Sequence, residues 1–191
     1  MNPTKYSPAI ALTVLCLFAG SASAHSGNHL LTGFSSGLSH PLLGLDHLLA
    51  MIAIGLWAAQ QGGRALWAVP AAFVGAMVVG GGLAWAGLAL PQLETGIAAS
   101  VLVLGLLIST RRQWAVTAGM MVAAGFALLH GYAHGLEMPQ AVSPALYALG
   151  FVLATACLHG VGIAGSLIGR RAMQVAGTAI AASGLVMLFG L

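Results

Sequence analysis

Residues 39–60 read SHPLLGLDHLLAMIAIGLWAAQ, and this stretch decides the fold. From Pro41 onward it is apolar, with Asp46 and His47 as the ionisable side chains within it. About 20 apolar residues, at about 1.5 Å of rise each, cross a bilayer core about 30 Å thick. Ionisable groups inside a bilayer are costly and usually functional. The stretch therefore predicts a membrane-spanning helix that carries a polar site.

The composition of the whole chain supports a membrane protein. Of the 191 residues, 59% are hydrophobic and 5% are charged, and the mean hydropathy is +0.97. These values exclude a soluble globular domain of ordinary composition and a disordered chain. Six Lys and Arg residues are too few for a basic nucleic-acid-binding face, so we expect no nucleic-acid partner.

Helix-length apolar stretches recur along the chain and predict an all-α, polytopic membrane helix bundle. The sequence indicates six transmembrane helices in a single domain of residues 25–191, at 41–60, 66–89, 94–110, 113–134, 144–168 and 172–190. Residues 1–24 are typical of a cleaved signal peptide, since Lys5 precedes an apolar run that ends in Ala22-Ser23-Ala24.

The arginines predict how the bundle is oriented. With a cleaved signal peptide, the mature N-terminus lies outside, in the periplasm, and so does the C-terminus after six spans. The positive-inside rule is then satisfied, because every arginine falls in a cytoplasmic connection: Arg64, Arg111, Arg112, Arg170 and Arg171. We expect a multi-pass protein of the inner (plasma) membrane.

A helix break is predicted at the start of the first span. Proline disfavours helix at the preceding residue and suits the first position of a helix, so we expect a helix to begin at Pro41 with His40 at its cap. A short half-helix over residues 30–38 would precede the break. Asp46 and His47 would then lie about 8–9 Å below the outer end of the first long helix. Broken helices line polar cavities in transporters.

A second polar cluster ends the fourth predicted span. His130, His134 and Glu137 share one helical face, at a depth similar to that of Asp46 and His47. Imidazoles with carboxylates suit Ni²⁺, Co²⁺ or Zn²⁺ better than Ca²⁺ or Mg²⁺. We therefore take His40, Asp46, His47, His130, His134 and Glu137 as candidate metal ligands, carrying a transported or bound ion rather than a permanent cofactor.

Further histidines are secondary candidates. His159 lies deeper, in the fifth span, and is either a second station for the ion or a hydrogen-bonding partner between helices. His25 and His29 would stand at the mature N-terminus, where they either collect metal or belong to a solvated tail. Glu94 begins a span and is interpreted as a helix N-terminal charge.

Three other functional classes compete with metal transport. His130 and His159 would be the axial ligands if the chain were a haem-binding electron-transfer subunit. An intramembrane metalloenzyme is not indicated, because the H-E-x-x-H signature is absent, and we expect no enzymatic activity. A non-transporting metal-binding accessory protein is the nearest alternative to a permease.

The two polar motifs resemble those of the HupE/UreJ family of nickel permeases and hydrogenase or urease accessory proteins. His40-x5-Asp46-His47 and His130-Gly131-x2-His134-Gly135-x-Glu137 match the motifs of that family, with Leu129 where the family often has Phe. The resemblance implies transport of Ni²⁺ from periplasm to cytoplasm for nickel enzymes, carried by the six candidate ligands. It also implies hydrogenase or urease maturation proteins as partners.

Overall fold

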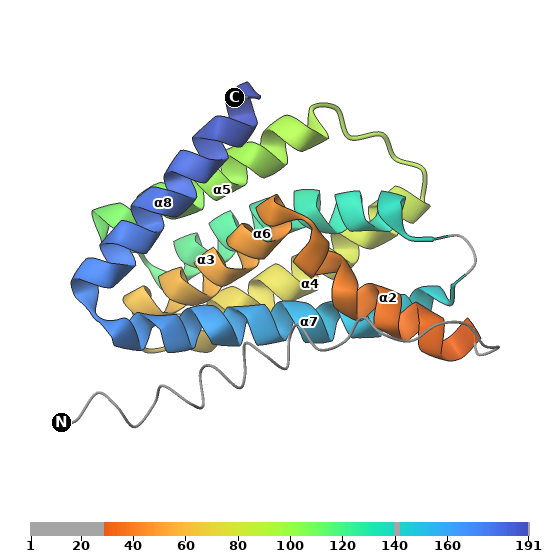
Figure 1. Cartoon of the computed structure of the whole chain (residues 1–191), viewed down its shortest axis with the longest axis horizontal. Coiled ribbons are helices and arrows are strands. Elements are labelled where there is room, and N and C mark those ends of the chain that lie inside the picture. The colour runs from red at the N-terminus through yellow and green to blue at the C-terminus, as the bar shows by residue number, and fades with distance from the viewer. Residues whose placement is uncertain (1–28, 140–141, 191) are drawn as a thin grey trace.

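The computed structural model describes residues 29–139 and 142–190, and only the backbone of residues 29–32. The predicted signal peptide and His25 lie outside the described residues, as does the side chain of His29. Figure 1 shows the helices in chain order: α2 (His29–Leu43), α3 (Leu45–Gln61), α4 (Ala65–Trp85), α5 (Leu93–Thr110), α6 (Val116–Glu137), α7 (Pro144–Gly165), the 3-10 turn η2 (Ser166–Ile168) and α8 (Arg170–Phe189).

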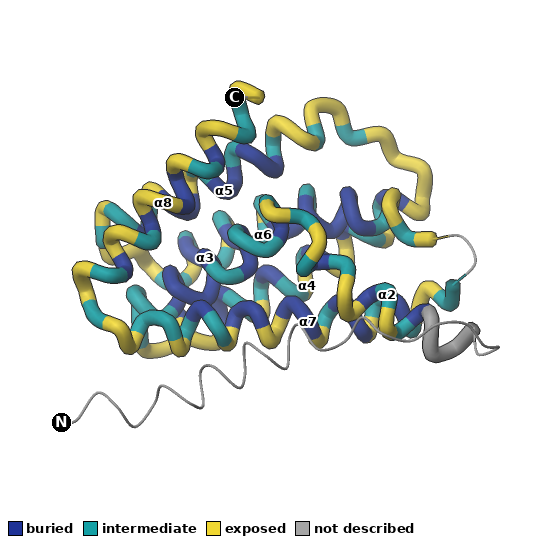
Figure 2. The backbone as a smooth tube through the Cα atoms, viewed as in Figure 1, coloured by how far each residue is buried: buried dark blue, intermediate teal, exposed yellow. Residues whose placement is uncertain are grey.

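The predicted membrane bundle is confirmed. Five helices, α4 to α8, are long and apolar enough to cross a membrane, α7 together with η2. The pair α2 and α3 passes the same test together, with a bend of 84° at its break, and counted as one broken span it brings the number to six. Figure 2 shows exposed residues on the outward faces of the helices and buried ones where helices meet. Large apolar side chains such as Met121 and Val175 are among those exposed, as expected for a surface covered by lipid.

The first long helix begins at Leu45, four residues later than the predicted start at Pro41. Pro41 is inside α2, which continues to Leu43, so His40 is a helical residue and not a cap. Gly44 has an extended backbone, and α3 begins at Leu45. The pre-proline restriction is a bias that packing can override. Here α2 is held against α7 so closely that a Cβ atom on Gly37 would collide with the backbone of Tyr147.

Both halves of the broken span run along α7. Gly37 of α2 packs on α7 at Tyr147, and Gly55 of α3 packs on α7 at the carbonyl of His159. The break therefore lies beside the middle of α7 and not at the end of the bundle. Phe151, at this level, is about two turns or 10 Å into α7.

Glycines in the second polar motif bring α6 against α4. A Cβ atom on Gly131 would collide with the backbone of Met77, and one on Gly135 would lie 2.8 Å from the carbonyl oxygen of Gly81. Gly131 and Gly135 stand at the small-xxx-small spacing that is typical of close packing between membrane helices. Because each motif glycine follows a histidine, α6 presses one face on α4 and keeps an adjacent face for His130 and His134.

The two ends of the bundle differ in charge. The arginine end carries Arg64, Arg111 and Arg112 in the connections between helices and Arg170 and Arg171 at the start of α8. There the Gln61 side-chain amide donates to the carbonyl of Arg112 at 3.0 Å. The acidic end is the opposite one, where α4 and α6 end and α5 and α7 begin; Asp46, Glu94 and Glu137 lie in this half.

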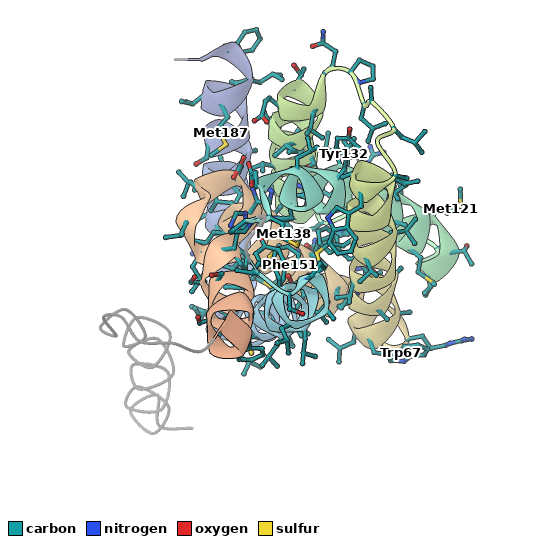
Figure 3. All side chains as sticks on the ribbon, turned by 90° about the vertical axis from the view of Figure 1, so that its right-hand side faces the viewer. Trp67, Met121, Tyr132, Met138, Phe151 and Met187 are labelled. Carbon is teal, nitrogen blue, oxygen red and sulfur yellow. The ribbon has the colours of Figure 1, made fainter. Side chains whose placement is uncertain are left out.

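The interior between the helices is filled mainly by apolar side chains. Helices α3 and α4 contribute four fully buried large side chains to one core cluster: Met51, Ile54, Trp57 and Phe73. Figure 3 is turned so that the side where α6 ends and α7 begins faces the viewer; Phe151 lies inside the ring of helices and Met121 at its edge. The polar site lies next to this core, on the side of the acidic end.

Candidate metal centre

Asp46 and His47 form a fixed pair in the first turn of α3, immediately after the break. One carboxylate oxygen of Asp46 accepts the backbone N–H of His47 at 2.7 Å and contacts its ring Nδ1, also at 2.7 Å. A Cβ atom on Gly44 would lie 2.8 Å from that oxygen, so glycine leaves room for the pair. The carboxylate thereby keeps the proton of neutral His47 on Nδ1 and leaves the lone pair of Nε2 for a ligand.

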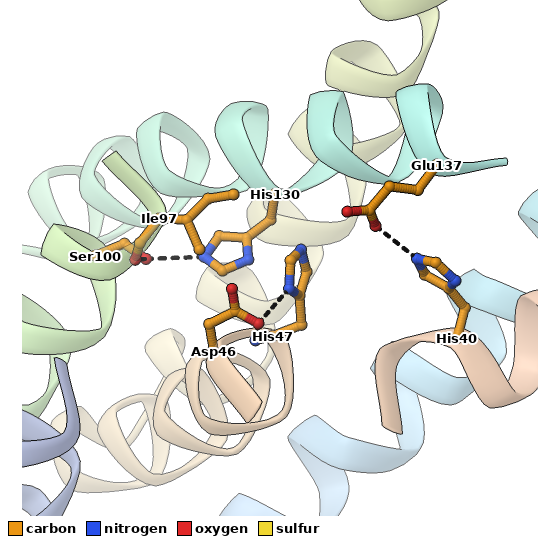
Figure 4. Close-up of polar contacts among 7 residues, drawn as sticks. All are labelled: His40, Asp46, His47, Ile97, Ser100, His130 and Glu137. Carbon is orange, nitrogen blue, oxygen red and sulfur yellow. Dashed lines mark hydrogen bonds and ion pairs between the residues drawn. The ribbon is translucent and has the colours of Figure 1, made fainter. Parts of the chain in front are cut away.

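Ser100 of α5 orients His130 in a similar way. The Ser100 hydroxyl donates its hydrogen to the carbonyl of Ile97 at 2.7 Å and lies 2.8 Å from Nε2 of His130. Since the hydroxyl has one hydrogen, it must accept the N–H of the imidazole. The lone pair of neutral His130 is then on Nδ1. Figure 4 shows both supporting contacts.

His134 links these two imidazoles to a third. Its ring centroid is 4.0 Å from that of His47 and 4.8 Å from that of His40, while the centroids of His47 and His130 are 4.7 Å apart. The ring centroid of Phe151 also lies 4.0 Å from that of His134. Four histidines from α2, α3 and α6 are thus in consecutive contact.

His40 and Glu137 close the site on the exposed side. Nε2 of His40 lies 2.9 Å from a carboxylate oxygen of Glu137, which is the third contact in Figure 4. His40, His134 and Glu137 each offer one ligand atom, and these atoms lie within 4.8 Å of one another. Such a spacing lets one metal ion draw all three together.

These side chains surround a cavity of about 410 Å³. The acids Asp46, Glu94 and Glu137 all line it, and so do three imidazoles. Its complete lining is His40, Leu43, Gly44, Asp46, His47, Glu94, His134 and Glu137. His130 lies behind this wall and reaches the cavity through its contact with His47.

Glu94 is a residue that the sequence reasoning assigned only to a helix terminus. It is indeed in the first turn of α5. It also lines a second cavity of about 450 Å³, which shares Asp46 and Glu94 with the first and continues toward Met187 near the end of α8. Its position at the start of a span, at the same end as the other acids, was the signal that could have placed it in the site. The sequence contains no comparable signal that Ser100 belongs to the site.

The electrostatics of this half of the bundle favour a cation. Three carboxyl groups line one cavity, whereas every arginine of the described residues lies at the arginine end. A cleft lined by charge of one sign and walled by apolar helices concentrates counter-ions. The cavity is therefore suited to attract a positively charged ligand from the acidic end.

The imidazoles carry the chemistry of the site. Within the described parts of the chain, four of their buried nitrogen atoms have no hydrogen-bond partner: Nε2 of His47, Nδ1 of His130, and Nδ1 and Nε2 of His134. Buried polar atoms without partners are rare and call for an explanation such as an ion. Nitrogen and carboxylate donors in this number suit a borderline transition-metal ion.

His159 is not part of this cluster. The ring centroid of His159 lies 5.3 Å from that of Phe73. The centroid of Phe73 lies 6.1 Å from that of His130. Phe73 therefore packs against both imidazoles. The structure brings five of the six principal candidates to the lining of one cavity, with His130 behind it in contact with His47, and places His159 beyond Phe73, further toward the arginine end.

Fold and site together define a polytopic membrane helix bundle with a histidine and carboxylate cavity beside a broken helix. The chain belongs to the HupE/UreJ family, since the family model described as "HupE / UreJ protein" matches residues 13–187. It is 41% identical to Protein HupE of Rhizobium leguminosarum bv. viciae over 191 residues, covering 97% of this chain and all of that protein. No solved structure matches the chain significantly.

Proposed function

We propose that the chain is a secondary permease that carries a divalent transition-metal ion, Ni²⁺, from the periplasm to the cytoplasm for the maturation of nickel enzymes. The observation that carries the proposal is the cavity at the helix break, where buried imidazole nitrogen atoms without hydrogen-bond partners among the described residues lie close to three carboxyl groups. A binding site that lies inside the bundle, next to an interrupted helix, is the arrangement found in secondary transporters.

The ligand set explains how an ion would leave water. His47 and His134 would offer nitrogen atoms in place of water molecules, and His130 would join them from the wall of the cavity. The carboxylates of Asp46 and Glu137 would offset the charge of the ion, and Glu94 would add to this. Asp46 and Ser100 each engage one ring nitrogen of an imidazole, which leaves Nε2 of His47 and Nδ1 of His130 to bind the ion.

The assignment to Ni²⁺ comes from the HupE/UreJ motifs and not from the geometry. Imidazole and carboxylate ligands also accept Co²⁺ and Zn²⁺, and affinity alone does not separate these ions. The same family membership supports hydrogenase or urease maturation proteins as the downstream partners.

The energy for transport would come from the membrane potential or from protons. The sequence has no G-x-x-x-x-G-K-[ST] loop for nucleotide binding. Moving two positive charges inward through 100 mV is worth about 4.6 kcal/mol, which corresponds to roughly a thousandfold accumulation. This is sufficient for uptake without ATP.

The proposed orientation places the arginine end in the cytoplasm of a cell with an inner (plasma) membrane. The metal cavity then opens toward the periplasm, and both ends of the mature chain lie on that side. Residues 1–24 are proposed to be the signal peptide that sets this topology, leaving residues 25–191 as one domain.

Haem binding fits the structure less well. His130 and His159 would have to face each other across a porphyrin, but the ring of Phe73 packs against both of them. A purified protein without a Soret band would agree with this. The accessory protein that binds metal without transporting it uses the same cavity, so only a transport measurement separates it from a permease.

Uptake of radioactive nickel by cells that express the chain tests the proposal. His47→Ala and His130→Ala are expected to abolish uptake at wild-type expression, because each removes an oriented imidazole. Gln174→Ala at the arginine end serves as the control and is expected to retain it. Uptake by the histidine variants equal to that of the wild type would contradict the proposal.

A further inference from the structure

A group of soft ligand atoms lies one helical turn deeper than the histidine cluster. The hydroxyl of Thr155 lies 3.4 Å from the sulfur of Met51 and 3.8 Å from the sulfur of Met77. Thr155 and Met51 are completely buried, and Met77 is 2% exposed. Three helices, α3, α4 and α7, thus bring two thioethers to one oxygen atom.

The orientation of Thr155 is unusual for this protein. Hydroxyl groups in helices commonly bond to the carbonyl three or four residues earlier, where they need no tertiary partner. Seven other hydroxyls of the described helices and of η2 do so: Ser39, Ser100, Ser109, Thr110, Ser166, Thr178 and Ser183. Thr155 points at two sulfur atoms instead.

These residues continue the outer site along each helix. Met51 follows His47 by one turn on α3, and Thr155 follows Phe151, which contacts His134, by one turn on α7. One turn further along α7 is His159. This imidazole is 2% exposed, and its Nε2 is a buried atom without a hydrogen-bond partner among the described residues.

We propose that Met51, Met77, Thr155 and His159 form an inner site for a borderline or soft transition-metal ion. The ion would pass from the outer histidine cluster to the two thioethers and then to His159, where Phe73 packs against the imidazole. This inference rests on the proposed transport of a metal ion and adds a second binding position to it.

The chemistry of the inner site gives it a selective role. Thioethers bind soft and borderline ions, whereas Mg²⁺, Ca²⁺ and Mn²⁺ prefer oxygen ligands. The outer cavity, with three carboxyl groups, can attract any divalent cation. Two thioethers beneath it would let Ni²⁺ proceed, whereas hard ions would find the Thr155 hydroxyl as the one oxygen ligand of the proposed inner site.

The double variant Met51→Leu/Met77→Leu tests the inner site. Leucine is close to methionine in volume, so the core is expected to remain packed. Met173→Leu, at a buried methionine of α8, is the matched control. The full-length proteins are purified, loaded with two equivalents of Ni²⁺ and measured by X-ray absorption at the nickel edge; their initial Ni²⁺ uptake is measured in sealed proteoliposomes.

Sulfur neighbours of nickel are expected in the wild type and in Met173→Leu and are expected to vanish in the double variant, with uptake at least tenfold slower. Nickel without sulfur neighbours in the loaded wild type, or wild-type uptake by the double variant, would overturn the inner site. Sulfur ligation in a wild type that does not transport would support the inner site and refute the permease. Transport without sulfur ligation would support the permease and refute the inner site.

Discussion

His47 and His134 lie in ring contact, with centroids 4.0 Å apart, although they come from helices α3 and α6. Both rings are almost completely buried, and Nε2 of His47 and both nitrogens of His134 have no hydrogen-bond partner in the described structure. Two buried imidazoles placed together with free nitrogen atoms are costly unless a ligand uses them. This contact joins the two sequence motifs into one site.

Replacing Ser100 by alanine is expected to weaken Ni²⁺ binding by about 10- to 100-fold, the range typical for residues that orient a metal ligand. The variant removes the acceptor for Nε2–H of His130, so the ring loses its fixed tautomer. Isothermal titration of the purified protein measures the affinity. Ser109→Ala removes a hydroxyl from the same helix that donates to the carbonyl of Leu106, and this variant is expected to bind Ni²⁺ normally.

Gly44→Ala is expected to lower Ni²⁺ affinity at least tenfold, because the added methyl group would displace Asp46 and His47. Its Cβ would lie 2.8 Å from the Asp46 carboxylate and 3.2 Å from Nδ1 of His47. Gly75→Ala on α4 meets nothing within 4 Å and is the control. Equal affinities of the two variants in equilibrium dialysis would show that the Asp46 and His47 geometry does not govern binding.

Gly131→Ala is expected to destabilise the bundle by about 1–3 kcal/mol, the usual cost of overpacking. The methyl group would collide with the backbone of Met77 and force α4 and α6 apart. Thermal unfolding in detergent measures the effect. Gly125→Ala, on the same helix but facing open space, is expected to keep or raise the melting temperature. An unchanged or higher melting temperature for Gly131→Ala would contradict the close packing of α6 on α4, because the helix propensity of alanine alone would stabilise α6.

Nickel is expected to stabilise the purified protein by about 2.7 kcal/mol at a concentration one hundred times its dissociation constant. The ion would bind the folded protein and not the unfolded chain, because unfolding separates the ligands of the cavity. A thermal shift with Ni²⁺, reversed by a chelator, measures this. His47→Ala is expected to lose the shift, and a shift that persists in this variant would place the main binding position elsewhere.

The sequence predicted the membrane bundle and the composition of the site because both depend on local patterns. Long apolar stretches identify helices, and the spacing of His130, His134 and Glu137 identifies a helical face. The first long helix was predicted to begin at Pro41 and begins at Leu45. The prediction used the local conformational preference of proline, which does not include the packing of α2 on α7.

The parts that were missed depend on how helices pair. α3 packs on α7, and α5 packs on α8, although neither pair is adjacent in the sequence. Glu94 lines the cavity together with residues of α2, α3 and α6. Ser100 reaches His130 from the neighbouring helix, but the sequence does not say which faces of α5 and α6 meet. Thr155 and Met77 likewise meet from helices that the sequence does not join. The sequence lists the polar residues but does not say which helices are neighbours.

Reconstitution into sealed vesicles tests the central claim most directly. Vesicles that contain the full-length protein and a metal-sensing dye are given Ni²⁺ outside, with and without an inside-negative potential. A permease is expected to give a dye response that grows with the potential and that is lost in His47→Ala. A protein that binds Ni²⁺ tightly in detergent but never delivers it to the dye would contradict a permease and identify a metal-binding accessory protein.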